Sequence, residues 1–139
     1  MREYHDFRDS LKKLELIHTL GPQNLAKFRF LVDTGEQSVG EAVRALLRMG
    51  RLILGEGAPE EDVEVVKMLG KGGILSPGRV RKMERLLSFR RALLEAKAAD
   101  GEEAISAREV YAAFERLRKD LTELGETLSK YLPFEMREG

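Results

Sequence analysis

Apolar residues recur every three or four positions along nearly the whole chain, and no segment alternates apolar and polar residues as a strand would. This pattern predicts an all-α protein. The first helix is expected over residues 4–20, because Gly21 and Pro22 stop the periodic pattern there. The apolar face of this helix consists of Phe7, Leu11, Leu14 and Ile17.

The second helix is expected to run without a break over residues 22–54, which gives a rod of about 50 Å at 1.5 Å per residue. Gly35 and Gly50 stand in its inward series, and a glycine inside a helix costs roughly 1 kcal/mol relative to alanine. These glycines indicate that another helix packs closely, with a kink as the alternative. The full inward series is Phe28, Val32, Gly35, Val39, Val43, Leu46, Gly50 and Ile53.

Three further helices follow from local signals. A short one opens at the acidic run 59–62, and Ser76 and Pro77 are typical of the N-cap and first turn of the next. The last helix begins at a capping box formed by Ser106 and Glu109. Its seam follows a heptad spacing, which favours near-antiparallel packing at about 20°. The seam residues are Val110, Phe114, Leu117, Leu121, Leu124, Leu128 and Tyr131, and the aromatic residues expected in the core are Phe28, Phe89 and Phe114.

The predicted fold is therefore an antiparallel up-down four-helix bundle with one short extra helix, in a single domain over residues 1–139. The chain has no cysteine, which excludes disulfides, thiol catalysis, zinc–thiolate sites and iron–sulfur clusters. With His5 and His18 as the only histidines, we expect neither a metal nor a cofactor.

Charge is balanced between 24 basic and 24 acidic residues, which argues against a general polyanion binder and leaves RNA binding with little support. The chain shows neither a signal-sequence pattern nor an apolar run long enough for a membrane span. We therefore expect a cytoplasmic protein that does not associate with membranes.

Arg90 is the most unusual residue of the pattern, because it falls on the same helical stripe as Met83, Leu87 and Leu94. A guanidinium stays charged in proteins, so one that points toward a core needs carboxylate or carbonyl partners, or a cleft to line. Two interpretations stay open. Arg90 either bridges helices by pairing with an acid such as Glu36, or it lines a cleft and holds a phosphate.

The order of the helices, together with a Gly-Ile-Leu-Ser turn before the arginine-bearing helix, resembles the HepT-like family. The stretches that carry the resemblance are Val-Val-Lys-Met-Leu at 65–69, Gly-Ile-Leu-Ser at 73–76, Arg-Leu-Leu-Ser-Phe-Arg at 85–90 and Glu-Val-Tyr at 109–111. The resemblance covers nearly the whole chain. It implies a homodimeric four-helix bundle that binds a small nucleotidyltransferase of the MntA type in a toxin–antitoxin module.

Active members of that family carry a ribonuclease site of arginine followed by asparagine, then a histidine, then a tyrosine that is also the nucleotide acceptor. Here Arg90 matches the arginine, whereas Arg91, Glu95 and Lys97 stand where asparagine, histidine and tyrosine are expected. Arg91 and Glu95 also have the spacing of a simple ion pair along a helix. The resemblance therefore implies a HepT-like subunit with little or no ribonuclease activity. The alternatives are an active metal-independent ribonuclease that uses Arg90, and a helical scaffold for protein binding.

Arg44, Arg48 and Arg51 share the side of the second helix opposite its apolar stripe. Such a series is typical of a solvated face. Alternatively, these three residues and Arg91 bind an acidic partner or phosphates. Tyr111 and His18 are expected to be packing residues.

We predict that purified wild type and Arg90→Ala cleave RNA at the same low background rate. Metal-free cleavage needs a group that exchanges a proton near neutral pH, whereas unperturbed glutamate and lysine titrate near about 4.3 and 10.4. Losing a positioned acid or base typically slows such a reaction by about 10² to 10⁴. Gel assays of labelled RNA measure the rate, and wild-type cleavage that Arg90→Ala abolishes would establish the ribonuclease instead.

Overall fold

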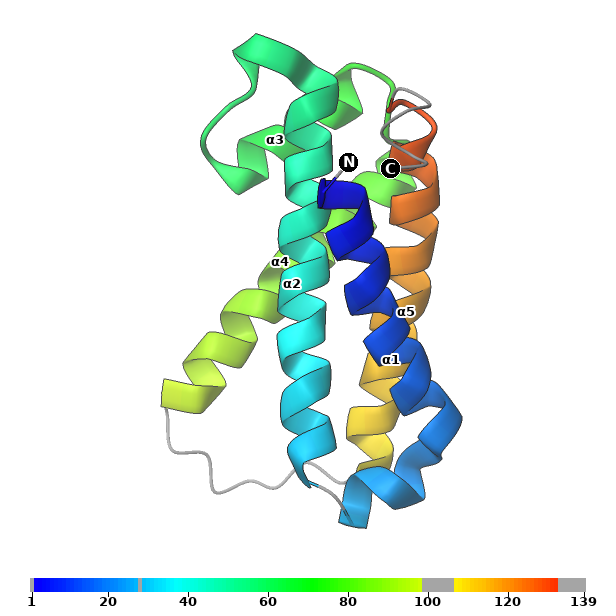
Figure 1. Cartoon of the computed structure of the whole chain (residues 1–139). Coiled ribbons are helices and arrows are strands. Elements are labelled where there is room, and N and C mark those ends of the chain that lie inside the picture. Colours follow the sequence, from blue (N-terminus) through cyan, green and yellow to red (C-terminus); the bar gives the residue numbers. More distant parts are fainter. Residues whose placement is uncertain (1, 28, 99–106, 133–139) are drawn as a thin grey trace.

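The computed structural model describes residues 2–27, 29–98 and 107–132, and the side chains at 2, 26, 29, 90–98 and 107–109 lie outside that description. Every regular element in these ranges is helical, so the all-α prediction is confirmed. Successive long helices run in opposite directions, which gives an up-down helical bundle (Figure 1). The elements are α1 (Arg2–Lys27), α2 (Arg29–Leu54), the short 3₁₀ turn η1 (Gly55–Gly57), α3 (Asp62–Lys71), α4 (Pro77–Ala98) and α5 (Ala107–Ser129).

The break at Gly21 is confirmed, but the uninterrupted second helix over 22–54 is wrong. Gly21 adopts φ 79° and ψ 170°, which interrupts α1, and Pro22 starts a further helical segment that ends at Lys27. A separate helix, α2, then begins at Arg29 and spans 26 residues, about 39 Å instead of 50 Å. The bend has a packing reason, because it returns Leu25 to the core, where only 3% of its surface is exposed.

The core is formed mainly by α1, α2 and α5, which pack side by side, while α3 and α4 close one end (Figure 1). Phe114 is buried and Phe89 is half-buried against this core, as expected, whereas Phe28 lies outside the described residues. The seam of α5 is confirmed from Phe114 to Leu128. It is wrong at Tyr131, which is 51% exposed, because α5 ends at Ser129 and Leu132 is buried instead.

Both glycines of the inward series lie at close helix contacts, and the kink alternative is wrong. A Cβ built on Gly35 would lie 2.6 Å from the ring of Phe114, and one on Gly50 would lie 3.0 Å from Leu69. The sequence pattern missed a third such contact, at Gly125, where a Cβ would overlap the ring of Phe7. These contacts bring α2 against α5 and α3, and α5 against α1.

Helix α4 joins the bundle through its first half and then diverges from it. Its N-terminus is as expected, because the backbone N–H of Arg79 donates to Ser76 Oγ at 3.3 Å. Met83 and Leu86 are fully buried, whereas the end near Ala98 lies apart from α2 and α5 (Figure 1). Among the helices described, none combines the length and the apolar character that a membrane span requires.

We expect Gly35→Ala and Gly40→Ala to change stability in opposite directions, although both residues lie inside α2. The added methyl group at Gly35 meets the buried ring of Phe114, so the free energy of unfolding should fall by about 1 kcal/mol or more. Nothing lies within 4 Å of a Cβ at Gly40, so the same change there should raise it by up to about 1 kcal/mol. Urea unfolding followed by circular dichroism measures both. Equal effects of the two substitutions would contradict the close packing at Gly35.

Candidate functional site

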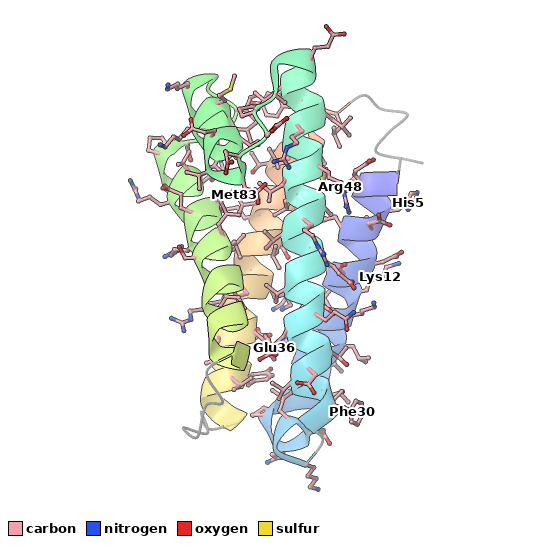
Figure 2. The ribbon with its side chains drawn as sticks, turned by 90° about the vertical axis from the view of Figure 1, so that its left-hand side faces the viewer. His5, Lys12, Phe30, Glu36, Arg48 and Met83 are labelled. Atoms are coloured by element: carbon pink, nitrogen blue, oxygen red, sulfur yellow. The ribbon has the colours of Figure 1, made fainter. Side chains whose placement is uncertain are left out.

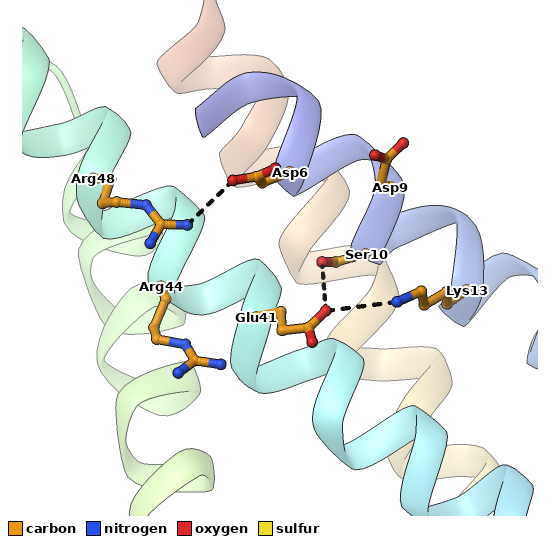
Figure 3. Close-up of a pocket in the computed structure, with 7 residues that line it drawn as sticks. All are labelled: Asp6, Asp9, Ser10, Lys13, Glu41, Arg44 and Arg48. Atoms are coloured by element: carbon orange, nitrogen blue, oxygen red, sulfur yellow. Dashed lines mark hydrogen bonds and ion pairs between the residues drawn. The ribbon is translucent and has the colours of Figure 1, made fainter. Parts of the chain in front are cut away.

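An open groove of about 370 Å³ lies between α1 and α2, and charged side chains form most of its lining (Figure 3). The two helices lie side by side and form the walls of the groove, so its lining residues are about one turn apart on each helix. The lining residues are Asp6, Asp9, Ser10 and Lys13 from α1, and Glu41, Arg44 and Arg48 from α2.

Two of the acids in this groove are paired within it. Glu41 Oε2 accepts a hydrogen bond from Ser10 Oγ at 3.3 Å and lies 3.8 Å from Lys13 Nζ. Asp6 Oδ2 lies 3.7 Å from Arg48 Nη2. The dashed lines of Figure 3 mark these contacts, which connect α1 to α2 along the groove.

Arg44 is the cation of the groove that has no partner among the residues described. It is exposed and projects beside Arg48, but neither an ion pair nor a hydrogen bond joins it to a described group (Figure 3). Asp9 on the opposite wall is likewise exposed and makes no such contact there. The groove therefore presents one cation and one anion that a bound molecule could pair.

Arg51 differs from Arg44 and Arg48 in its partners. Its Nη2 donates to Asp62 Oδ1 and to the carbonyl oxygen of Glu60, both at 2.8 Å, and its Nε donates to the carbonyl oxygen of Pro59 at 3.3 Å. Arg51 therefore connects α2 to the segment that leads into α3. Its hydrogen bonds have a structural role, and only Arg44 and Arg48 line the groove.

The residues of the HepT-like motif lie on the diverging half of α4. The backbone of α4 is helical through Arg90, Arg91, Glu95 and Lys97, but the side chains of all four lie outside the described residues. The predictions for these residues stay predictions. Glu36, the acid considered for a bridge to Arg90, is half-buried on α2 (Figure 2).

A second polar cluster joins α1 to α5 around His18, and it corrects the prediction that His18 is a packing residue near the inward face. The side chain of His18 is 48% exposed, and its Nδ1 lies 2.6 Å from Glu115 Oε1. Tyr111 is half-buried against the core, as expected, and its hydroxyl donates to the carbonyl oxygen of His18 at 3.0 Å. The ring of Tyr111 also stacks beside that of His18, with centroids 6.4 Å apart.

Arg118 fixes the carboxylate that faces His18. Its Nε donates to Glu115 Oε1 at 3.2 Å and its Nη2 donates to Oε2 at 3.0 Å. These hydrogen bonds lower the pKa of Glu115 most, the hydrogen bond with His18 lowers it further, and partial burial opposes both. Glu115 is therefore ionised near neutral pH and can only accept hydrogen bonds.

Comparison with known proteins gives no relative for this chain: no family model, no curated protein and no solved structure matches it. Among the described residues, the histidine and carboxylate side chains form no group of three or more that could hold a metal ion. The candidate sites are thus the charged groove and the His18 cluster, defined here as His18, Tyr111, Glu115 and Arg118.

We predict that Glu115→Gln lowers the free energy of unfolding at neutral pH. We also predict that this free energy falls less steeply in the variant when the pH is lowered. The pKa of Glu115 is lower in the folded protein than its ordinary value of 4.5, so its contribution is present above that value and is lost as pH falls through the folded pKa. Urea unfolding between neutral pH and about pH 3 should show a shallower loss in the variant than in wild type.

Glu126→Gln is the matched control for this prediction, because Glu126 is an exposed residue of the same helix whose carboxylate makes no hydrogen bond or ion pair with a described group. It should follow the wild-type curve. A Glu115→Gln curve parallel to wild type through the acid range would contradict the role of the carboxylate.

Proposed function

We propose that this protein is a helical-bundle subunit that binds a second protein through the groove between α1 and α2. The observation that supports this most directly is Arg44, an exposed cation that has no partner among the described residues of a charged groove. The order of helices and the Gly-Ile-Leu-Ser turn, which resemble the HepT-like family, favour a small nucleotidyltransferase of the MntA type as the partner.

The charge pattern of the groove fits a protein surface better than a polyanion. Its lining contains both cations and acids, so a nucleic-acid backbone would meet Asp6, Asp9 and Glu41 as well as the basic residues. A protein partner can place a carboxylate against Arg44 and an amine against Asp9. Arginine suits this role, because its planar guanidinium binds a carboxylate through two parallel hydrogen bonds.

The exposed ion pairs beside Arg44 contribute more to the selectivity of partner binding than to its affinity. Asp6 and Arg48 are both nearly half exposed and lie 3.7 Å apart, and such surface pairs contribute about 0–1 kcal/mol. Their charges nevertheless set the pattern that a partner has to match, and like charges placed against them are unfavourable. The proposal assigns no bond-making chemistry to the groove.

The proposed subunit is also a homodimer, and the diverging half of α4 is the surface that supports this. Figure 2 shows α1 and α4 on opposite flanks of α2, so a second copy that packs along α4 would leave the groove between α1 and α2 open. The sequence of this half of α4 includes Leu93 and Leu94, apolar residues on a helix that leaves its own bundle. One assembly can then hold two copies and two partners.

Co-expression with the product of the neighbouring gene tests the partner, and we expect the two proteins to co-purify. Arg44→Glu should weaken the complex about tenfold or more, because it reverses the unpaired charge. Arg116→Glu is the control, since Arg116 is an exposed arginine of α5 outside the groove and without a described partner. Titration calorimetry measures both affinities, and light scattering of the free protein tests the dimer.

Three results would contradict this proposal. Failure of the wild-type proteins to associate at micromolar concentration would remove the nucleotidyltransferase partner. Equal weakening by Arg44→Glu and Arg116→Glu would show that the groove is not the contact surface. A free protein with the mass of one chain at all concentrations would remove the homodimer.

A further inference from the structure

Two large apolar side chains of α1 and α2 are exposed to solvent. Leu16 of α1 is 57% exposed and Phe30 of α2 is 61% exposed, the highest values among the large apolar residues that the structure describes. Single exposed apolar residues are common on protein surfaces, so their position decides whether they mark a binding surface.

The spacing along each helix places both residues in line with the charged groove. Leu16 follows Asp9 by seven positions on α1, and Phe30 precedes Arg44 by fourteen positions on α2. Seven residues make two helical turns with a drift of only about 20°, so residues at this spacing share one side of a helix. Figure 2 shows Phe30 and Arg48 toward opposite ends of α2, both on its α1 side.

The ion pairs of the groove fix how the two helices are aligned. Asp6 lies 3.7 Å from Arg48, and seven residues further along α1, Lys13 lies 3.8 Å from Glu41. Seven residues forward on α1 thus correspond to seven residues back on α2, as in an antiparallel pair. In this alignment, Leu16 lies beyond both pairs, so the two walls present charges first and apolar side chains further along.

We propose that the groove receives an amphipathic helix of the partner protein, acidic where it meets Arg44 and apolar where it meets Leu16 and Phe30. This inference rests on the proposed function, because it names the part of the partner that the groove binds. A helix is the element whose side chains return to one side every seven residues, as the residues of both walls do. The distance from Phe30 to Arg44 along α2 is about 21 Å at 1.5 Å per residue, so the bound helix has about four turns or more.

The two groove charges that have no partner among the described residues determine the polar end of this helix. Arg44 belongs to the α2 wall and Asp9 to the α1 wall. The bound helix therefore places a carboxylate toward α2 and an amine toward α1. Because unlike charges attract and like charges on the partner are unfavourable, this arrangement selects one rotational setting of the helix.

A synthetic helical peptide of about 18 residues is the probe, so the test needs no natural partner. It carries a glutamate near one end and a lysine one turn later. One leucine follows the lysine by seven residues, and a second follows the glutamate by fourteen. The matched peptide has lysine in place of the glutamate. Fluorescence anisotropy of the labelled peptides measures affinity, and wild type should bind the glutamate peptide about tenfold more tightly than the matched one.

Three exposed positions of the protein give the variants. Arg44→Glu should reverse the preference between the two peptides, because the reversed charge on α2 attracts the lysine. Leu16→Gln should weaken both peptides by about fivefold, because the apolar contact at the far end is lost. Arg116→Glu, on α5 outside the groove, should bind both peptides like wild type. Circular dichroism checks that each variant is folded.

The proposal is overturned if wild type binds neither peptide at about 1 mM, if Arg44→Glu keeps the wild-type preference, or if Leu16→Gln binds like wild type. A free wild-type dimer that Arg44→Glu dissociates would show a second copy in the groove, which also overturns it. Peptide binding without co-purification of the neighbouring gene product would remove the nucleotidyltransferase alone. Co-purification without peptide binding would remove the helix alone.

Discussion

The close approach of α1, α2 and α5 is the constraint on which both candidate sites depend. Gly35 lets α2 pack against the ring of Phe114 on α5, and Gly125 lets α5 pack against the ring of Phe7 on α1. A methyl group at either glycine would meet an aromatic ring that is itself buried, so the helices would have to shift. Such a shift would change the relative positions of the helices that carry both sites, because each site draws its residues from two of these three helices.

Helix α4 is attached in a different way, which explains why it can leave the bundle. Its first half is anchored by the fully buried Met83 and Leu86 and by ion pairs to α5, of which Lys82 Nζ to Glu123 Oε2 is the shortest at 2.7 Å. Its second half diverges from α2 and α5 (Figure 1). Apolar burial contributes far more than exposed ion pairs, so Met83 and Leu86 hold the first half of α4 in place.

The periodicity of the sequence predicted which faces are buried, but not where helices end or which residues meet across the bundle. It identified Gly35 and Gly50 as close contacts, because a glycine on an apolar stripe has a cost that only packing offsets. It failed at Tyr131, because the heptad spacing of apolar residues continues in the sequence beyond Ser129, where α5 ends. It also failed at His18, whose partner Glu115 is 97 residues away. Arg51 matched its neighbours in spacing, and only the return of the chain at residues 59–62 gave it separate partners.

The two sites differ in what they contribute to the fold. The contacts of the groove are long and exposed, such as Lys13 Nζ to Glu41 Oε2 at 3.8 Å, so its charges can change at little cost in stability. The contacts of the His18 cluster are shorter and less exposed, and they connect the end of α1 to α5. A loss of binding after a groove substitution therefore reports on recognition, because the fold does not need those charges. A substitution at Glu115, in contrast, removes contacts that hold the end of α1 against α5.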